Sequence, residues 1–394
     1  MEAPQTRTIS FLPWLRIKEP VRVGRFVFTP FLDRDDQITE PVREIGEAIR
    51  TIVSGYVDLR GTPLRNCVLI LDAQLTPLWD LPVSALSEAR WATAQLFLAA
   101  FSMNEYFTQV RQYSNSSLFT VYHQSFTLPI DFVAVNSRRR DGSLMVGGYR
   151  HGEMKFTVPV YADMAGELRQ FDVGLLAALE QASSKGSSVV NRLRAALSFL
   201  SLANTDSEAM VPDAEIILMI SAYEQLLASS ETGARHLAQS LSALFDRFGS
   251  VTVEQAINNR PGIYIDPKYE KEQRVWPVRR KWMEEMYHLR NSYAHGESIT
   301  SRTWGWVPLE HLVMAALVFP LALKLLLAAE GHYEITRQDE VICAAVDGLL
   351  GQIDWREPSE KGRNCTRWEQ VLMDARSANR VARAVRLWQE RHQD

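Results

Sequence analysis

The feature that most constrains the fold is the apolar run HLVMAALVFPLALKLLLAAEG at residues 311–331. A segment of this length and composition either crosses a bilayer or fills the core of a helical domain. Lys324 lies inside the run, Pro320 interrupts it, and His311 and Glu330 mark its ends. These polar residues favour a core helix in which the stem of Lys324 is covered while its amine reaches water. We therefore expect a soluble protein with a large helical core and no membrane partner.

The composition narrows the class of protein further. The 394 residues exceed one ordinary domain. A formal net charge of −4 argues against coating nucleic acid by bulk attraction, so any contact with RNA must come from a local basic patch. The three cysteines show no CxxC spacing and give no zinc pattern or disulfide framework, which suits a reducing cytoplasm. With no apolar secretory signal at the start, we expect a cytoplasmic protein.

Residues 1–186 are predicted to form a mixed α/β domain. Helices are expected at 40–57 and 83–103, where apolar residues recur at helical spacing. Short runs rich in Phe, Val and Ile predict strands; they are TISFLPWLRI, RVGRFVFTPF, NCVLILDA, SLFTVYHQSFTL, DFVAVN, SLMVGG and MKFTVPV. The fold class expected for this part is α+β.

The rest of the chain is predicted to be almost wholly helical. A stretch rich in Ser and Gly at 180–192 is a candidate linker. We expect a helical domain over 187–330 and a helical extension over 331–394. The predicted helices are 188–203, 213–229, 233–247, 276–295, 308–330, 337–353 and a C-terminal pair around 366–391.

The stretch MYHLRNSYAHGES at 286–298 places chemically active residues at the end of a predicted helix. Gly296 is suited to the left-handed conformation that terminates a helix, so Arg290 and Asn291 lie in the last two turns and His295 at the end. Arg290 and His295 are about 140° apart around an ideal helix and do not stack directly. The alternative is a purely structural helix end with a solvated Arg and a capping His.

These residue types are the parts needed to cleave RNA without a metal. A guanidinium binds phosphate, an imidazole moves protons near neutral pH, and an amide can orient either group. One His cannot easily be base and acid in a single step. A two-fold dimer that joins two copies of this helix end would supply two copies of His295 and two of Arg290.

The segment LRNSYAHG (289–296) resembles the Arg-polar-x-x-x-His signature of HEPN domains, especially of the Apea-like branch, where the run ends in His-Gly. The upstream segment AALSFLSLANTDSEAMVPDAEIILMISAYEQLLAS is similar to earlier helices of that branch, including an apolar helix that carries a Glu, here Glu224. The resemblance covers roughly 187–330.

The resemblance implies an all-α bundle that forms a homodimer and acts as a metal-independent endoribonuclease, without cofactors. Arg290 and His295 would be the catalytic pair, and Asn291 would support them. Such proteins serve as toxins or in antiphage defence, and by analogy the N-terminal domain would sense a phage or host trigger. Two alternatives stay open. The chain can be a non-catalytic HEPN adaptor that binds RNA or protein, or its N-terminal domain can carry an activity of its own.

Supporting roles are expected for further residues near the motif. Glu224 would orient Arg290 by paired hydrogen bonds, or it is an exposed acid beside the core stripe. Tyr293 belongs to the apolar stripe of the motif helix. Arg279, Arg280 and Lys281 lie in the first turn of that helix, where basic residues oppose the helix dipole. They form either an RNA-binding patch or a solvated basic face.

Overall fold

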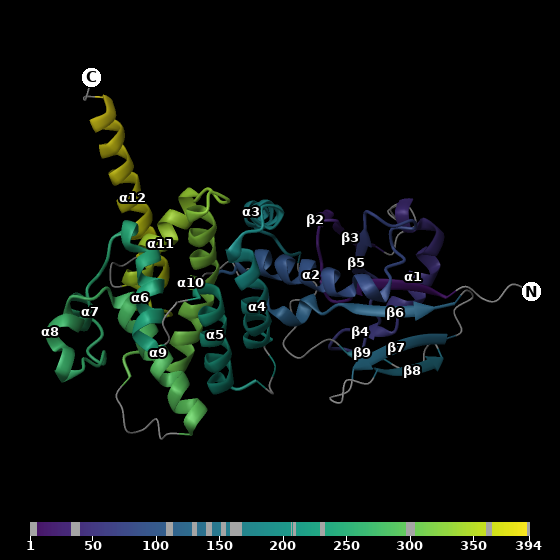
Figure 1. Cartoon of the computed structure of the whole chain (residues 1–394), viewed down its shortest axis with the longest axis horizontal. Coiled ribbons are helices and arrows are strands. Elements are labelled where there is room, and N and C mark those ends of the chain that lie inside the picture. Colours follow the sequence, from purple (N-terminus) through teal and green to yellow (C-terminus); the bar gives the residue numbers. More distant parts are fainter. Residues whose placement is uncertain are drawn as a thin grey trace, which may run out of the picture. The chain divides into compact units, whose positions relative to one another are not determined.

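The computed structural model describes residues 6–32, 40–107, 113–127, 132–138, 144–150, 155–157, 168–205, 207, 210–228, 233–296, 304–359 and 365–391. The chain forms two compact units (Figure 1). The sheet unit comprises Met1–Met103, Ser114–Leu176 and Asn204–Ala209. The helical unit comprises Asn104–Tyr113, Ala177–Ala203 and Met210–Asp394. The expected α+β part followed by a helical part is present, and residues 331–394 belong to the helical unit.

The sheet unit is built on an antiparallel sheet of seven strands in the order β2-β3-β5-β1-β6-β7-β8. A separate parallel pair joins β4 (Tyr56–Val57) to β9 (Phe156–Thr157). The seven strands are β1 (Arg7–Leu12), β2 (Val21–Val23), β3 (Phe26–Phe31), β5 (Cys67–Asp72), β6 (Tyr122–Phe126), β7 (Phe132–Arg138) and β8 (Leu144–Arg150). Each overlaps a run that the sequence predicts to be extended.

Strand β5 lies inside the sheet between β3 and β1, and its residues are covered on both faces. Its sequence CVLILD is buried at every position. Ile70 pairs with Phe28 of β3, and Leu69 pairs with Phe11 of β1. Helices α1 (Gly46–Val53) and α2 (Leu86–Phe101) add further buried apolar residues to this unit.

The helical unit is organised around α5 (Pro212–Leu227). This helix packs against α4 (Ser188–Ala203), α9 (Val278–His295) and α10 (Pro308–Ala329), and α6 (Ala234–Leu244) packs against α9 (Figure 1). The remaining helices are α3 (Val173–Ser184), which begins in the sheet unit, and α7 (Val253–Ile257), α8 (Glu270–Arg274), α11 (Arg337–Leu350) and α12 (Arg367–Arg391).

Two predictions about the helical part are wrong. The expected linker at 180–192 lies mostly within α3 and α4, and Gly186 (φ +68°) makes the short turn between them. Serines there are compatible with a helix because the Ser184 hydroxyl donates to the carbonyl of Gln181. The expected C-terminal pair is instead the single helix α12.

The apolar run forms α10, a core helix of the helical unit. About 67% of its most apolar window is buried. Lys324 does not reach water as predicted. It is buried, and its Nζ lies 2.7 Å from Asp339 Oδ1 in α11. The charge inside the apolar run is therefore neutralised by a partner within the protein, which favours the soluble interpretation over a membrane span.

The cysteines provide a test of the two cores. Burial raises the pKa of Cys67 and of Cys343 to about 12, whereas Cys365 is half-buried. Because the thiolate is the reactive form, we expect an aromatic disulfide reagent at neutral pH to modify Cys365 rapidly and the other two only after unfolding. Replacing Cys365 by Ser should abolish the fast phase. Rapid modification of a second thiol in the native protein would contradict the described packing.

Candidate functional site

Helix α9 carries the motif and ends at His295 as predicted, while it begins at Val278, two residues later than predicted. Pro277 precedes its first residue, and Gly296 follows its last with φ +68° in the left-handed region. Trp282, Met286 and Leu289 are buried along one stripe, and Tyr293 is half-buried at its end. Gly296 fits this place because a residue with a Cβ is strained there.

The start of α9 is anchored by a buried guanidinium. Arg279 Nη1 lies 2.5 Å from Asp347 Oδ2 of α11, and its Nη2 lies 3.0 Å from Asp246 Oδ1. The same side chain donates to the carbonyls of Ser242 and Gly249. Its donors are therefore committed to the protein.

The predicted RNA-binding patch is not formed by these basic residues. Lys281 is buried like Arg279, and its Nζ lies 2.7 Å from Glu284 Oε2. Arg280 is half-buried and stacks on Trp276, with its Cζ 3.8 Å from the ring centroid. The prediction is wrong for Arg279 and Lys281, because buried carboxylates rather than a bound phosphate compensate their charges.

The end of α9 places Arg290 against α5. Its Nη2 lies 3.8 Å from Glu224 Oε2, and its Nη1 donates to Asn291 Oδ1 at 2.9 Å. Its Cζ lies 5.5 Å from the ring centroid of Tyr287. The Nε–H has no acceptor among the described residues, and about 27% of the side chain is exposed. Arg290 is thus held in place against α5 while part of its side chain stays accessible to an anion.

His295 is exposed and stands apart from this group. No hydrogen bond or ion pair joins it to Arg290 among the described residues. The helical period instead places His295 almost in line with His288, seven residues earlier. A single chain therefore presents Arg290 on the α5 side of the helix and His295 on a different side, as their spacing predicts.

Two tyrosines brace the end of α9 against α5. Burial raises the pKa of Tyr293 to about 12, with the charge of Asp213 and a hydrogen bond to it adding to the effect. Burial also raises the pKa of Tyr287, and the nearby carboxylate of Glu224 adds to the shift. Both phenols are therefore neutral near pH 7 and can act as donors but not as bases. Tyr293 contacts Asp213 rather than the Arg290 group.

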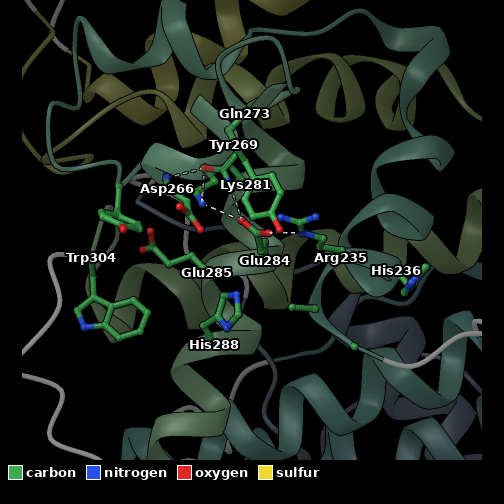
Figure 2. Close-up of a pocket in the computed structure, with 13 residues that line it drawn as sticks. Arg235, His236, Asp266, Tyr269, Gln273, Lys281, Glu284, Glu285, His288 and Trp304 are labelled. Atoms are coloured by element: carbon green, nitrogen blue, oxygen red, sulfur yellow. Dashed lines mark hydrogen bonds and ion pairs between the residues drawn. The ribbon is translucent and has the colours of Figure 1, made fainter. Parts of the chain in front are cut away.

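A cavity of about 440 Å³ lies on another side of α9, and sequence analysis missed it (Figure 2). It is lined by the start of α6, the loop before α8, one face of α9 and Trp304. The lining residues are Gly233, Ala234, Arg235, His236, Tyr264, Asp266, Tyr269, Gln273, Lys281, Glu284, Glu285, His288 and Trp304. The sequence signal was the polar series 281, 284, 285 and 288, which recurs at helical spacing along the predicted helix.

Hydrogen bonds make the floor of this cavity rigid. Gln273 Oε1 accepts from the Lys281 amine and from the backbone N–H of Asp266, and Gln273 Nε2 donates to Glu284. Arg235 stacks on Tyr269 with its Cζ 3.8 Å from the ring centroid. Its Nε also lies 3.8 Å from Glu284 Oε1. Glu284 is therefore neutralised from two sides.

Glu285 is the second buried acid at the cavity. Its Oε1 accepts from the backbone N–H of Trp306 at 3.0 Å, and Nε2 of the buried His311 lies 3.4 Å from the same oxygen. His311 in turn stacks on Trp282. These contacts hold the Glu285 carboxylate in one position at the cavity wall.

Comparisons with known proteins do not identify the chain: no family model, no curated protein and no solved structure matches it. Within the described parts of the chain, no group of three or more His, Cys, Asp and Glu residues is arranged to hold a metal ion. The function must therefore be argued from the geometry of α9 and its surroundings.

Replacing Arg279 by Ala leaves Asp347 without its buried partner. Breaking a buried ion pair from one side costs about 3–5 kcal/mol, so the free energy of unfolding should fall by that order. Replacing the exposed Arg274, which pairs with Glu270 on the surface, should cost less than about 1 kcal/mol. Urea denaturation of both variants beside the wild type measures the difference.

The decrease in the free energy of unfolding of the Arg279→Ala variant should depend on pH. Burial raises the pKa of Asp347 from 3.8 to about 6, against the opposing charge of Arg279. The contribution of Asp347 to stability is thus full below its unfolded pKa and declines as pH rises through the folded value. Without Arg279 the folded-state pKa of Asp347 rises further, so the decline continues to higher pH and the variant should differ most from the wild type above about pH 6. A pH-independent difference would contradict the ion pair.

Replacing Glu224 by Gln should lower the pKa of Tyr287, because the nearby negative charge disappears. The value should stay above 10, since burial is the larger cause of the shift. The free energy of unfolding should change by less than about 1 kcal/mol, because the Arg290–Glu224 pair is partly exposed. NMR titration of labelled tyrosines measures the shift. An unchanged pKa of Tyr287 would contradict the described contact with Glu224.

Proposed function

We propose that the protein is a metal-independent endoribonuclease of the HEPN type that acts as a homodimer in antiphage defence or as a toxin. The single observation that carries the proposal is the end of α9, where the side chain of Arg290 is partly exposed and His295 is exposed five residues further on. The resemblance of 289–296 to the Apea-like signature supplies the family context. A cytoplasmic location belongs to the same proposal.

The chemistry follows from the groups present. His295 takes the proton of a ribose 2′-hydroxyl, and the 2′-oxygen attacks the adjacent phosphorus. The P–O5′ bond breaks, and the leaving 5′-oxygen accepts a proton from an imidazolium. Arg290 binds the phosphoryl oxygens and stabilises the charge that builds on them. Asn291 and Glu224 position Arg290. The products carry a 2′,3′-cyclic phosphate and a 5′-hydroxyl, so DNA is not a substrate.

A dimer completes this site. One chain offers a single His295 on a different side of α9 from Arg290, so base, acid and phosphate clamp do not meet within a chain. A two-fold axis near the exposed end of α9 brings two imidazoles to one phosphate and lets Arg290 of either chain reach it. The sheet unit would then be the sensor for a phage or host trigger.

The second candidate is a non-catalytic HEPN adaptor that binds RNA or protein. The separation of His295 from Arg290 within the chain favours it, because an adaptor does not require the two residues to converge. The adaptor predicts RNA binding or dimerisation without cleavage.

The direct experiment is RNA cleavage in excess EDTA by the full-length protein. We expect cleavage to persist, and His295→Ala to lower the rate by about 10²–10⁴-fold because general acid–base catalysis is lost. Arg290→Ala should lower it by about 10²–10³-fold, as removal of a transition-state donor does. Fragment ends are examined for 2′,3′-cyclic phosphate.

Arg274→Ala serves as the matched control, because it removes an exposed arginine outside the site and should cleave like the wild type. Cleavage that both site variants retain would exclude this site. Cleavage of a DNA strand, or loss of activity in EDTA, would exclude the mechanism. RNA binding without cleavage, also in the presence of phage lysate, would support the adaptor.

A further inference from the structure

The cavity beside α9 has a chemical asymmetry that the proposed ribonuclease does not use. Figure 2 shows Glu285 and Trp304 on one side and Arg235 on the other, with Glu284 between them. One side carries the acid Glu285, and the other carries the guanidinium of Arg235. A ligand that fills the cavity must match both.

The Glu285 side presents carboxylate oxygens that the described residues do not fully use. The residue is only 5% exposed, and its Oε1 is occupied by the Trp306 backbone. Its Oε2 accepts no hydrogen bond from any described residue. Asp266 also lines the cavity, and its Oδ1 accepts from the backbone N–H of Lys268 while Oδ2 has no such partner among the described residues. A buried carboxylate oxygen without a donor requires one from a ligand or water.

The Arg235 side favours an anion. Helix α6 begins at Ala234, and Gly233 supplies no side-chain cap, so the first N–H groups of the helix lack that partner. Arg235 adds a guanidinium of which about 42% is exposed. An uncapped helix start beside an arginine suits a phosphate group. This end would repel a purely cationic ligand such as a guanidinium.

The walls of the cavity are aromatic. Tyr264, Tyr269 and Trp304 line it, and aromatic side chains commonly stack on unpaired bases. Among the four RNA bases, guanine presents two adjacent donors, N1–H and N2–H, on its Watson–Crick edge. Adenine and cytosine present a donor beside an acceptor there, and uracil flanks its single donor with acceptors.

We propose that this cavity binds a guanine nucleotide, with the base edge donating to Glu285 and Asp266 and the phosphate at the start of α6 beside Arg235. The nucleotide can be free or part of a single-stranded RNA. The proposal does not depend on ribonuclease activity, because binding is measured on ligands that cannot be cleaved.

The test is isothermal titration calorimetry of the full-length protein with GMP, AMP, IMP and guanosine. We expect GMP to bind at least about tenfold more tightly than AMP. AMP lacks one hydrogen bond to a charged group, and such a loss lowers affinity by about that factor. IMP lacks the N2 amine and should fall between them. Guanosine should bind more weakly than GMP, because it lacks the phosphate.

Variants assign the two ends. Glu285→Gln keeps an acceptor for Trp306 and puts an amide donor in place of the free oxygen. Its affinity for GMP should therefore fall by at least about tenfold. Asp266→Asn, at a less buried position, should also weaken the binding of GMP. Arg235→Ala should lower the affinity for GMP but not for guanosine, and Arg247→Ala, an exposed arginine outside the cavity, should change neither.

A 2′-O-methyl oligonucleotide with a single G, and its A-substituted match, separates the two sources. Tighter binding of the G oligonucleotide than of GMP indicates an RNA base site, and binding of GMP alone indicates a free nucleotide site. The proposal is overturned if neither binds up to about 1 mM. Equal affinity for AMP and GMP, or unchanged binding by both acidic variants, would also overturn it.

Discussion

The buried ion pair between Arg279 and Asp347 fixes the helix on which every functional argument rests. It ties the first turn of α9 to α11, and Asp246 shares the same guanidinium. Lys281 with Glu284, and Glu285 with His311, continue this polar packing along the next turns. A helix with so many buried charges is held in one rotation about its axis, because any twist would leave a charge unpaired.

That fixed rotation separates two sets of side chains. One side of α9 meets α5, where Glu224 and Tyr287 hold Arg290. Another side forms the wall of the cavity through Glu284, Glu285 and His288, and His295 continues the line of His288 past the cavity. The phosphate clamp of the proposed ribonuclease and its proton-transfer group therefore point in different directions from one chain. This separation is the physical reason why the proposed enzyme requires two copies.

Sequence patterns predicted those parts of the fold that depend on local rules. The end of α9 followed from Gly296, and α4 lies at the predicted positions. The turn between α3 and α4 was mistaken for a linker, because its Ser and Gly content outweighed apolar residues at helical spacing. The role of Arg279 was missed for another reason. Asp347 is 68 residues away from Arg279, and no local rule shows that an acid will meet a base over that distance.

The candidate site was predictable only in part. The motif identified Arg290, Asn291 and His295, and helical spacing indicated that Arg290 and His295 diverge. The cavity depends on residues from α6, from the loop before α8 and from Trp304, which come together only in the folded chain.

The measurement that tests the account most directly is the distance between the two copies of position 295 in solution. A spin label on His295→Cys, in a chain with Cys365 replaced by Ser, reports it by pulsed electron resonance, since Cys67 and Cys343 are buried. The account predicts a dimer with one short distance, the width of a cleft that holds a single phosphate. A monomer, or a dimer in which the two labels lie far apart, would contradict it.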